Sequence, residues 1–143
     1  MIGGAVPGVA VSGSATFRPD AGRVVGNDEV DAVVTANGGR PMTAEWVERM
    51  GVRERWWTAV PGGGPIDGAP TTPDLLAGAI DAALSDAAVG RADVDLVIAA
   101  TTTTSRLTTS MASVATGALG MHCAAFELRA GCASASAAMV AAY

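Results

Sequence analysis

Helix-like and strand-like segments alternate over the second half of this chain, from Thr72 to Tyr143, and this alternation limits its fold more than any other feature. Leu76, Ile80 and Leu84 recur every four residues, as on the buried stripe of a helix. The apolar run Val94–Ala100 (VDLVIAA) then indicates a strand covered on both faces. The order helix, strand, helix, strand, helix predicts βαβ units and an α/β layered fold.

Turn and capping residues set the expected boundaries in this half. Thr72 caps the first helix, Pro73 takes its first position, and Gly90 ends it. The remaining expected elements are a small-residue helix over Ser110–Leu119 with Gly120 as its stop, a strand over Cys123–Arg129, and a final helix that Cys132 opens.

The first half carries weaker signals. The expected elements are a first strand over Val6–Ala15, a helix over Asp28–Thr35 capped by Asn27, a helix over Ala44–Met50 capped by Thr43 and ended by Gly51, and turns and loops over Pro61–Pro70. The glycines of this last segment do not form a phosphate loop, because no lysine or helix start follows them in register.

Composition excludes several classes of function. A chain of 143 residues has the length of one domain, residues 1–143, and its net charge of −5 with no basic block argues against nucleic acid or an anionic membrane as partner. No apolar run approaches the roughly 20 residues of a membrane helix. The N-terminus lacks the basic lead and dense apolar centre of a signal peptide, so we expect a cytoplasmic protein.

The two cysteines are expected to stay apart. Cys123 and Cys132 stand at opposite ends of a predicted strand about 20 Å long, which excludes a disulfide between them. Two cysteines and the single histidine, His122, cannot make a structural zinc site. No metal site is therefore predicted.

The final helix lacks a polar face. From Ala133 to Tyr143 the only polar side chains are two serines and the terminal tyrosine, so this helix should be buried all round. No other segment obviously supplies a matching partner. We therefore expect the chain to be one half of something larger, and poorly soluble when alone because this helix would then be exposed.

Cys132 stands at the turn from the strand into this helix, after Gly131, which lets the backbone bend sharply. Free N–H groups and the dipole at a helix N-terminus favour a thiolate and could steady an oxyanion when a thioester carbonyl is attacked. The alternative is a buried structural cysteine, since free cysteine is among the most buried residue types. The residues alone leave both interpretations open.

The chain resembles a known family in several stretches that follow one another in the family's order. They are RVVGNDEV at Arg23–Val30, AEWVERMGVRERWW at Ala44–Trp57, the capped helix from Thr72, and VDLVIAATTTTSRLTTSMASVATGALGMHCAAFELRAGCASASAAM. The family is that of the ketoacyl-ACP synthase III condensing enzymes, which have the thiolase fold, and the resemblance is to their N-terminal half. It implies half of a thiolase-like fold, a layered βαβ arrangement with a buried small-residue helix after the nucleophile turn, whose C-terminal half is absent from this chain.

The resemblance implies roles for three residues. Cys132 would be the nucleophile that takes an acyl group from acyl-CoA or acyl-ACP, with the coenzyme A thioester as substrate and no resident cofactor. Trp46 and Arg49 would lie near the pantetheine or adenine end of coenzyme A, although WVERMG is one residue shorter than the family's spacing. The alternative for Trp46 is a core anchor. Arg53 and Arg55 are interpreted as structural charges beside a turn.

The sequence also departs from the family. Thr108 and Thr109 stand where the family often has an aromatic residue and a proline, which leaves the chain-length preference open. The family's histidine and asparagine, which drive decarboxylation and stabilise the enolate, come from the C-terminal half and have no counterpart here. His122 matches neither position and is interpreted as a loop residue. Either a second polypeptide or a further part of a longer or cleaved protein would have to supply them.

The expected function is acyl transfer onto Cys132 and then to a second substrate, by decarboxylative condensation with malonyl thioester in fatty-acid, polyketide or related biosynthesis. Alternatives are ester-forming or non-decarboxylative transfer, hydrolysis through Cys132, and a non-catalytic structural subunit. We expect complete units to form a dimer. Glu127 and Arg129 share one face of their strand, so Glu127 of one subunit is expected to face Arg129 of the other.

Overall fold

The computed structural model describes residues 8–60, 64–102, 104 and 107–143. The chain divides into two compact units, one made of residues 1–18 and 72–143 and the other of residues 19–71. Each unit has hydrogen-bonded strands of its own, and no sheet spans both.

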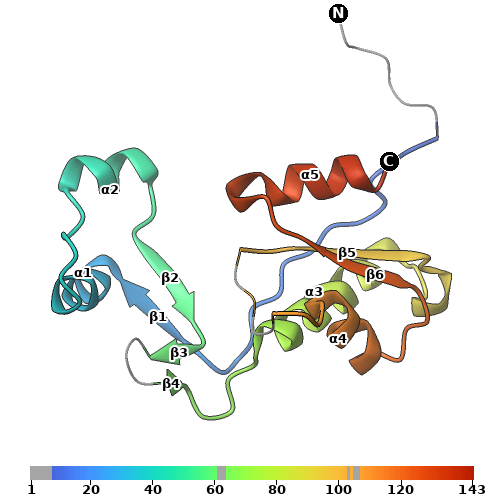
Figure 1. Ribbon diagram of the computed structural model, residues 1–143, viewed down its shortest axis with the longest axis horizontal. Helices are drawn as coiled ribbons and strands as arrows, with labels where there is room; N and C mark the ends of the chain where they lie inside the picture. Colours follow the sequence, from blue (N-terminus) through green and yellow to red (C-terminus); the bar gives the residue numbers. More distant parts are fainter. Residues whose placement is uncertain (1–7, 61–63, 103, 105–106) are drawn as a thin grey trace, which may run out of the picture. The chain divides into compact units, whose positions relative to one another are not determined.

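The first unit contains the alternating elements that the sequence predicts (Figure 1). They are α3 (Thr72–Ala87), the short 3₁₀ turn η1 (Arg91–Asp93), β5 (Leu96–Ala100), α4 (Met111–Ala118), β6 (Ala124–Leu128), the 3₁₀ turn η2 (Gly131–Ala133) and α5 (Ser134–Ala141). The two strands pair in parallel, from Leu96 opposite Ala124 to Ala100 opposite Leu128. The predicted βαβ unit, β5–α4–β6, is therefore confirmed.

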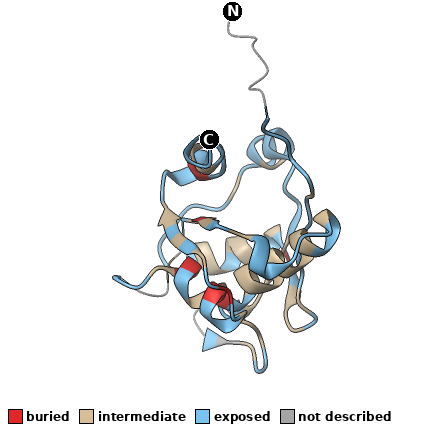
Figure 2. Cartoon of the chain, turned by 90° about the vertical axis from the view of Figure 1, so that its right-hand side faces the viewer, coloured by how far each residue is buried: buried red, intermediate tan, exposed pale blue. Residues whose placement is uncertain are grey.

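The two faces of this sheet are covered unequally. Helices α3 and α4 lie on one face and α5 lies on the other (Figure 1). The core gathers on the first of these faces, where Met111 is 1% exposed and Ala112 and Ala115 are fully buried. On the other face the helix that ends at the C-terminus is mostly exposed (Figure 2).

The burial predicted for β5 and α5 is not found within this chain. Leu96 on β5 is 38% exposed, and Met139 and Val140 on α5 are 73% and 75% exposed. Ser134 is the one buried residue of α5. An open hollow of about 400 Å³ lies between the helix and the strand, lined by Leu96, Ile98, Ala138, Met139 and Ala142. The apolar composition was correctly recognised, but the described residues supply no second layer to cover it.

The ends of α3 and α4 show which stop signals were interpreted correctly. Ser110 caps α4 by accepting a hydrogen bond from the Ala112 N–H at 3.1 Å, and Gly120 follows the helix with a φ of 66°, as predicted. Helix α3 ends earlier than predicted, at Ala87, because Ala88 itself adopts the left-handed conformation with a φ of 54°. Gly90, the predicted stop, instead precedes η1.

The strand predicted over Val6–Ala15 is wrong over its described part, residues 8–15, which contains no strand. This segment runs along α3. The Ser14 N–H donates to the Asp86 carboxylate at 2.8 Å. A Cβ atom on Gly13 would lie 2.6 Å from the backbone nitrogen of Ala87, so the absence of a side chain permits this close approach. The glycines that interrupt the apolar pattern thus serve contact with a helix rather than strand pairing.

The second unit consists of β1 (Arg23–Gly26), α1 (Asn27–Ala36), α2 (Ala44–Met50), β2 (Glu54–Trp57), β3 (Ala59–Val60) and β4 (Gly64–Pro65). Strands β1 and β2 pair antiparallel, as do β3 and β4. The sequence did not predict these four strands. Part of the loop predicted over Pro61–Pro70, residues 61–63, lies outside the described residues.

The two predicted helices of this unit are confirmed, with one change at a cap. Thr43 accepts the Trp46 N–H at 3.2 Å and Gly51 follows α2 with a φ of 70°, as predicted. Helix α1 is capped by Gly26 rather than Asn27. The Asn27 side chain instead donates to the Val52 carbonyl at 3.0 Å and accepts from Arg55 at 2.9 Å, so it joins α1 to the segment before β2.

Candidate active site

Cys132 lies where β6 gives way to α5. The strand ends at Leu128, and the chain turns through η2, in which Gly131 has a φ of 57° and Cys132 is the middle residue. Because such a backbone conformation suits glycine, Gly131 is the residue that permits the turn. Cys132 therefore precedes the first residue of α5 by two positions, rather than opening the helix as predicted.

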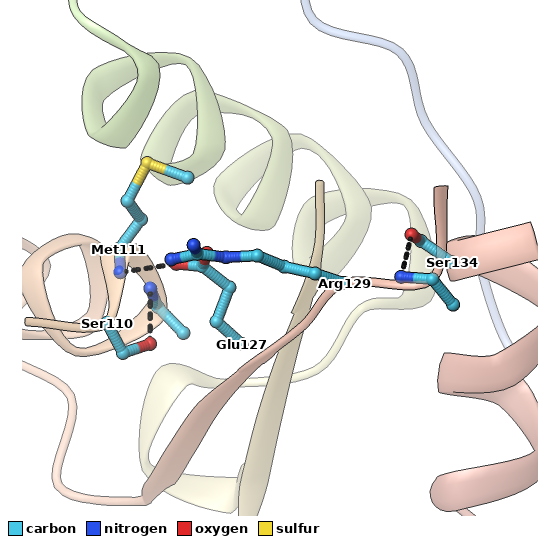
Figure 3. Close-up of polar contacts among 7 residues, drawn as sticks. Ser110, Met111, Glu127, Arg129 and Ser134 are labelled. Atoms are coloured by element: carbon cyan, nitrogen blue, oxygen red, sulfur yellow. Dashed lines mark hydrogen bonds and ion pairs between the residues drawn. The ribbon is translucent and has the colours of Figure 1, made fainter. Parts of the chain in front are cut away.

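Ser134 holds this turn together. Its hydroxyl donates to the Gly131 carbonyl at 2.7 Å and accepts from the Ala130 N–H at 2.8 Å, so one buried side chain ties both sides of Cys132 (Figure 3). No side chain caps the N-terminus of α5. Its first backbone N–H groups are therefore open to water or to a ligand.

The thiol of Cys132 is accessible. Both cysteines are free, and Cys132 is exposed whereas Cys123 is partly buried at the other end of β6. The alternative of a buried structural cysteine is thus not what this structure shows. A strand of five residues spans about 16 Å, too far for the two sulfurs to bond. The nucleophilic role of Cys132 stays a prediction.

Glu127 on β6 anchors the start of α4. One carboxylate oxygen accepts the Met111 N–H at 3.0 Å and the other accepts the Arg129 Nε–H (Figure 3). The Glu127 side chain is only 6% exposed. The backbone hydrogen bond from Met111 lowers the pKa of Glu127, burial opposes this effect, and Arg129 adds to it. Together Glu127 and Ser110 satisfy the first two N–H groups of α4.

This contact corrects the expectation for Glu127 and Arg129. The two residues pair within the chain, not with a partner subunit, and both oxygens of Glu127 are already engaged. Sequence reasoning placed them on one face of the strand but missed the contact with α4. The signal was present, because Glu127 is the only acidic residue in an otherwise apolar strand.

Trp46 and Arg49, the residues predicted to contact coenzyme A, lie on α2 in the second unit. They are three positions apart and so share one side of the helix. Trp46 is 45% exposed, which does not fit the alternative of a core anchor, and it lines a hollow of about 280 Å³ with Arg40, Pro41, Met42 and Thr43. Their ligand contacts stay a prediction. Of the two arginines interpreted as structural, Arg55 is partly buried against Asn27 and Arg53 is exposed.

The single histidine is remote from the cysteine along β6. His122 is exposed in the loop before the strand, whereas Cys132 follows it, so its interpretation as a loop residue is confirmed. Within the described ranges, no three His, Cys, Asp or Glu side chains are grouped to hold a metal ion. The helices described here include none that combines the length and apolar character needed to cross a membrane.

Comparison with known proteins gives a consistent set of relatives. No protein-family model matches the chain. It is 37% identical over 125 residues to the beta-ketoacyl-[acyl-carrier-protein] synthase III of Cereibacter sphaeroides, covering 86% of this chain and 34% of that enzyme. AbyA1, a tetronic acid condensing enzyme, superposes with a TM-score of 0.63 at 28% identity, over 91% of this chain and 38% of AbyA1. OleA of Xanthomonas campestris superposes with a TM-score of 0.68 at 23% identity, over 92% of this chain and 39% of OleA.

The chain thus spans between about a third and two fifths of the length of these relatives. The α/β fold class and the resemblance proposed from sequence are both confirmed.

Proposed function

Because this chain belongs with the ketoacyl-ACP synthase III-like condensing enzymes of the thiolase fold, we propose that it carries the nucleophile of an acyltransferase. In this proposal Cys132 accepts an acyl group from acyl-CoA or acyl-ACP. The observation that carries it is the exposed thiol on a tight turn between a parallel sheet and the uncapped N-terminus of α5. An accessible thiol beside free backbone N–H groups suits attack on a thioester.

The first step is thioester exchange. The Cys132 sulfur attacks the acyl carbonyl carbon, the carbonyl oxygen becomes an oxyanion, and backbone N–H groups near the turn stabilise it. When the carbonyl re-forms, the bond to the donor sulfur breaks. The proton lost from Cys132 ends on the departing thiol, so the products are an acyl-cysteine and free coenzyme A or carrier protein.

The second step transfers the acyl group to an acceptor. With a malonyl thioester as acceptor, loss of carbon dioxide would leave an enolate carbon, which attacks the acyl carbon and releases the Cys132 thiolate. This chemistry needs groups that stabilise the enolate. The only histidine here, His122, lies at the far end of β6, so we propose that the missing groups come from a C-terminal half outside these 143 residues.

Trp46 and Arg49 complete the proposal on the donor side. An exposed indole and a guanidinium on one side of α2 suit the adenine and phosphate groups of coenzyme A. One structure of OleA was obtained with bound lauric acid and lauroyl-CoA, which supports a long-chain thioester as a donor for this fold. We further propose that complete units act as dimers in the cytoplasm.

Intact-mass measurement tests the nucleophile directly. The complete natural protein that contains this chain is incubated with a panel of acyl-CoA donors. A covalent acyl adduct is expected, which is lost in Cys132→Ser and retained in the matched control Cys123→Ser. An adduct on Cys132 that water releases without an acceptor would indicate a hydrolase. Absence of any adduct across the panel would overturn the proposal in favour of a non-catalytic subunit.

A further inference from the structure

A polar hollow lies beside β6, the strand that leads to Cys132. Its volume is about 410 Å³ and it is lined by Leu107, Thr108, Thr109, Ser110, Glu127 and Arg129. Three of these side chains carry a hydroxyl and one carries a positive charge. The lining is therefore unlike that of the hollow beside α5, where every lining residue is apolar.

Arg129 is held in a defined orientation on one side of this hollow. Its Nε–H donates to Glu127, which is 6% exposed, whereas the Arg129 side chain is 44% exposed. Glu127 is itself fixed by the Met111 N–H (Figure 3). Since the buried carboxylate holds the guanidinium at Nε, the two terminal nitrogens remain for another partner, and the described residues provide none.

The remaining chemistry of the hollow favours a carboxylate. The two terminal nitrogens of a guanidinium form a fork that matches the two oxygens of a carboxylate. Hydroxyl groups such as those of Thr108 and Thr109 donate hydrogen bonds to the same oxygens. The first N–H groups of α4 take no part, because Glu127 and Ser110 already occupy them.

The hollow is also close to Cys132 along the chain. Arg129 precedes Cys132 by three residues, and three residues span at most about 11 Å even when fully extended. An acyl group of a few carbons on the Cys132 sulfur is therefore of the right scale to reach the guanidinium, which extends several ångströms from its own backbone.

We propose that this hollow binds a carboxylate at the far end of the acyl group, and that Arg129 is the residue that selects donors carrying it. This inference rests on the proposed role of Cys132 and deepens it, because it names the donor class: thioesters of dicarboxylic acids. Glu127 acts as a positioning residue, since it orients Arg129 without touching the substrate.

Two donors of equal carbon number test the selection. In the complete natural protein, the rate of Cys132 acylation is measured by intact mass with glutaryl-CoA, which ends in a carboxylate, and valeryl-CoA, which ends in a methyl group. Glutaryl transfer is expected to be faster. Arg129→Gln keeps an N–H for Glu127 but removes the charge. It should slow glutaryl transfer about tenfold or more, the worth of a charge-assisted hydrogen bond, and leave valeryl transfer unchanged.

Controls separate this inference from the proposed function. Arg53→Gln removes the same charge from an exposed residue of the second unit and should alter neither rate. Thr108→Val, for use where the arginine variant does not fold, should slow glutaryl transfer less than Arg129→Gln but in the same direction. Valeryl adducts without faster glutaryl transfer, or equal losses for both donors, would overturn the selection and leave the nucleophile standing. No adduct from either donor would overturn both.

Discussion

Helices α4 and α5 have nearly the same composition and opposite surroundings. Both have eight residues, and both are built from alanine, serine, valine and methionine with few other types. Helix α4 buries Met111, Ala112, Ala115 and Thr116, whereas α5 buries only Ser134. They lie on opposite faces of the same two-stranded sheet (Figure 1).

The difference comes from neighbours, not from the helices. Helix α4 is enclosed by α3 and by both strands, so its small side chains permit close approach on every side. Helix α5 contacts the strands and the turn η2 alone, and its outer face carries Met139 and Val140. A small-residue helix is thus suited to burial, but a second layer decides whether burial occurs. In α5 the same suitability leaves apolar surface exposed.

The strongest test of this comparison is Met111→Ala in α4. The Met111 side chain is 1% exposed and extends toward α3 (Figure 3). Its truncation would leave a cavity in the core, so the free energy of unfolding should fall by about 2–5 kcal/mol. Urea denaturation followed by circular dichroism measures this loss. Met111→Leu conserves volume and should cost less than about 1.5 kcal/mol. A loss below about 1 kcal/mol for the alanine variant would mean that α4 is not the core that the structure shows.

A smaller effect is expected from Glu127→Gln, which removes the charge that joins β6 to α4. Glutamine keeps an oxygen for the Met111 N–H but leaves Arg129 without its ion pair, so about 1–3 kcal/mol should be lost at neutral pH. Glu54→Gln on β2 is the control, because Glu54 is exposed.

The pH dependence of this loss has a defined sign. Folding lowers the pKa of Glu127, so the native state stabilises the charged form. The contribution is complete above the ordinary glutamate pKa of about 4.3 and is lost as the pH falls through the lowered folded value. The difference in stability between wild type and Glu127→Gln should therefore shrink only in acid. A difference that stays constant from pH 7 to pH 3 would contradict the charge-based explanation.

Sequence patterns predicted best where local chemistry decides the structure. Thr43 and Ser110 cap their helices as expected, and Gly51 and Gly120 follow the helix ends in the left-handed conformation. The parallel pairing of β5 with β6 followed from the alternation of elements. Each of these features depends on a few neighbouring residues, so a single sequence contains the information.

Features that depend on distant parts of the chain were not predictable in the same way. The glycine-rich segment through Gly13 gave a strand-like pattern, but its place on α3 depends on Ala87, far along the chain. The pairing of β1 with β2 joins residues about 30 positions apart. Glu127 showed its strand face but not its partner at Met111, because that contact requires α4 to be positioned first. The turn at Cys132 was located from sequence, whereas the contacts around it were not.

The smallest effect is expected from Met139→Ala, the counterpart of Met111→Ala on the exposed helix. Met139 is 73% exposed, so its truncation in these 143 residues should change the free energy of unfolding by no more than about 0.5 kcal/mol. Peroxide oxidation gives an independent reading, because Met139 should be converted to the sulfoxide well before Met111. If Met139→Ala cost as much as Met111→Ala, or if both methionines were equally protected, α5 would have to be covered in solution. The contrast between the two helices would then describe an unassembled chain, and the hollow between α5 and β5 would mark the face that its cover occupies.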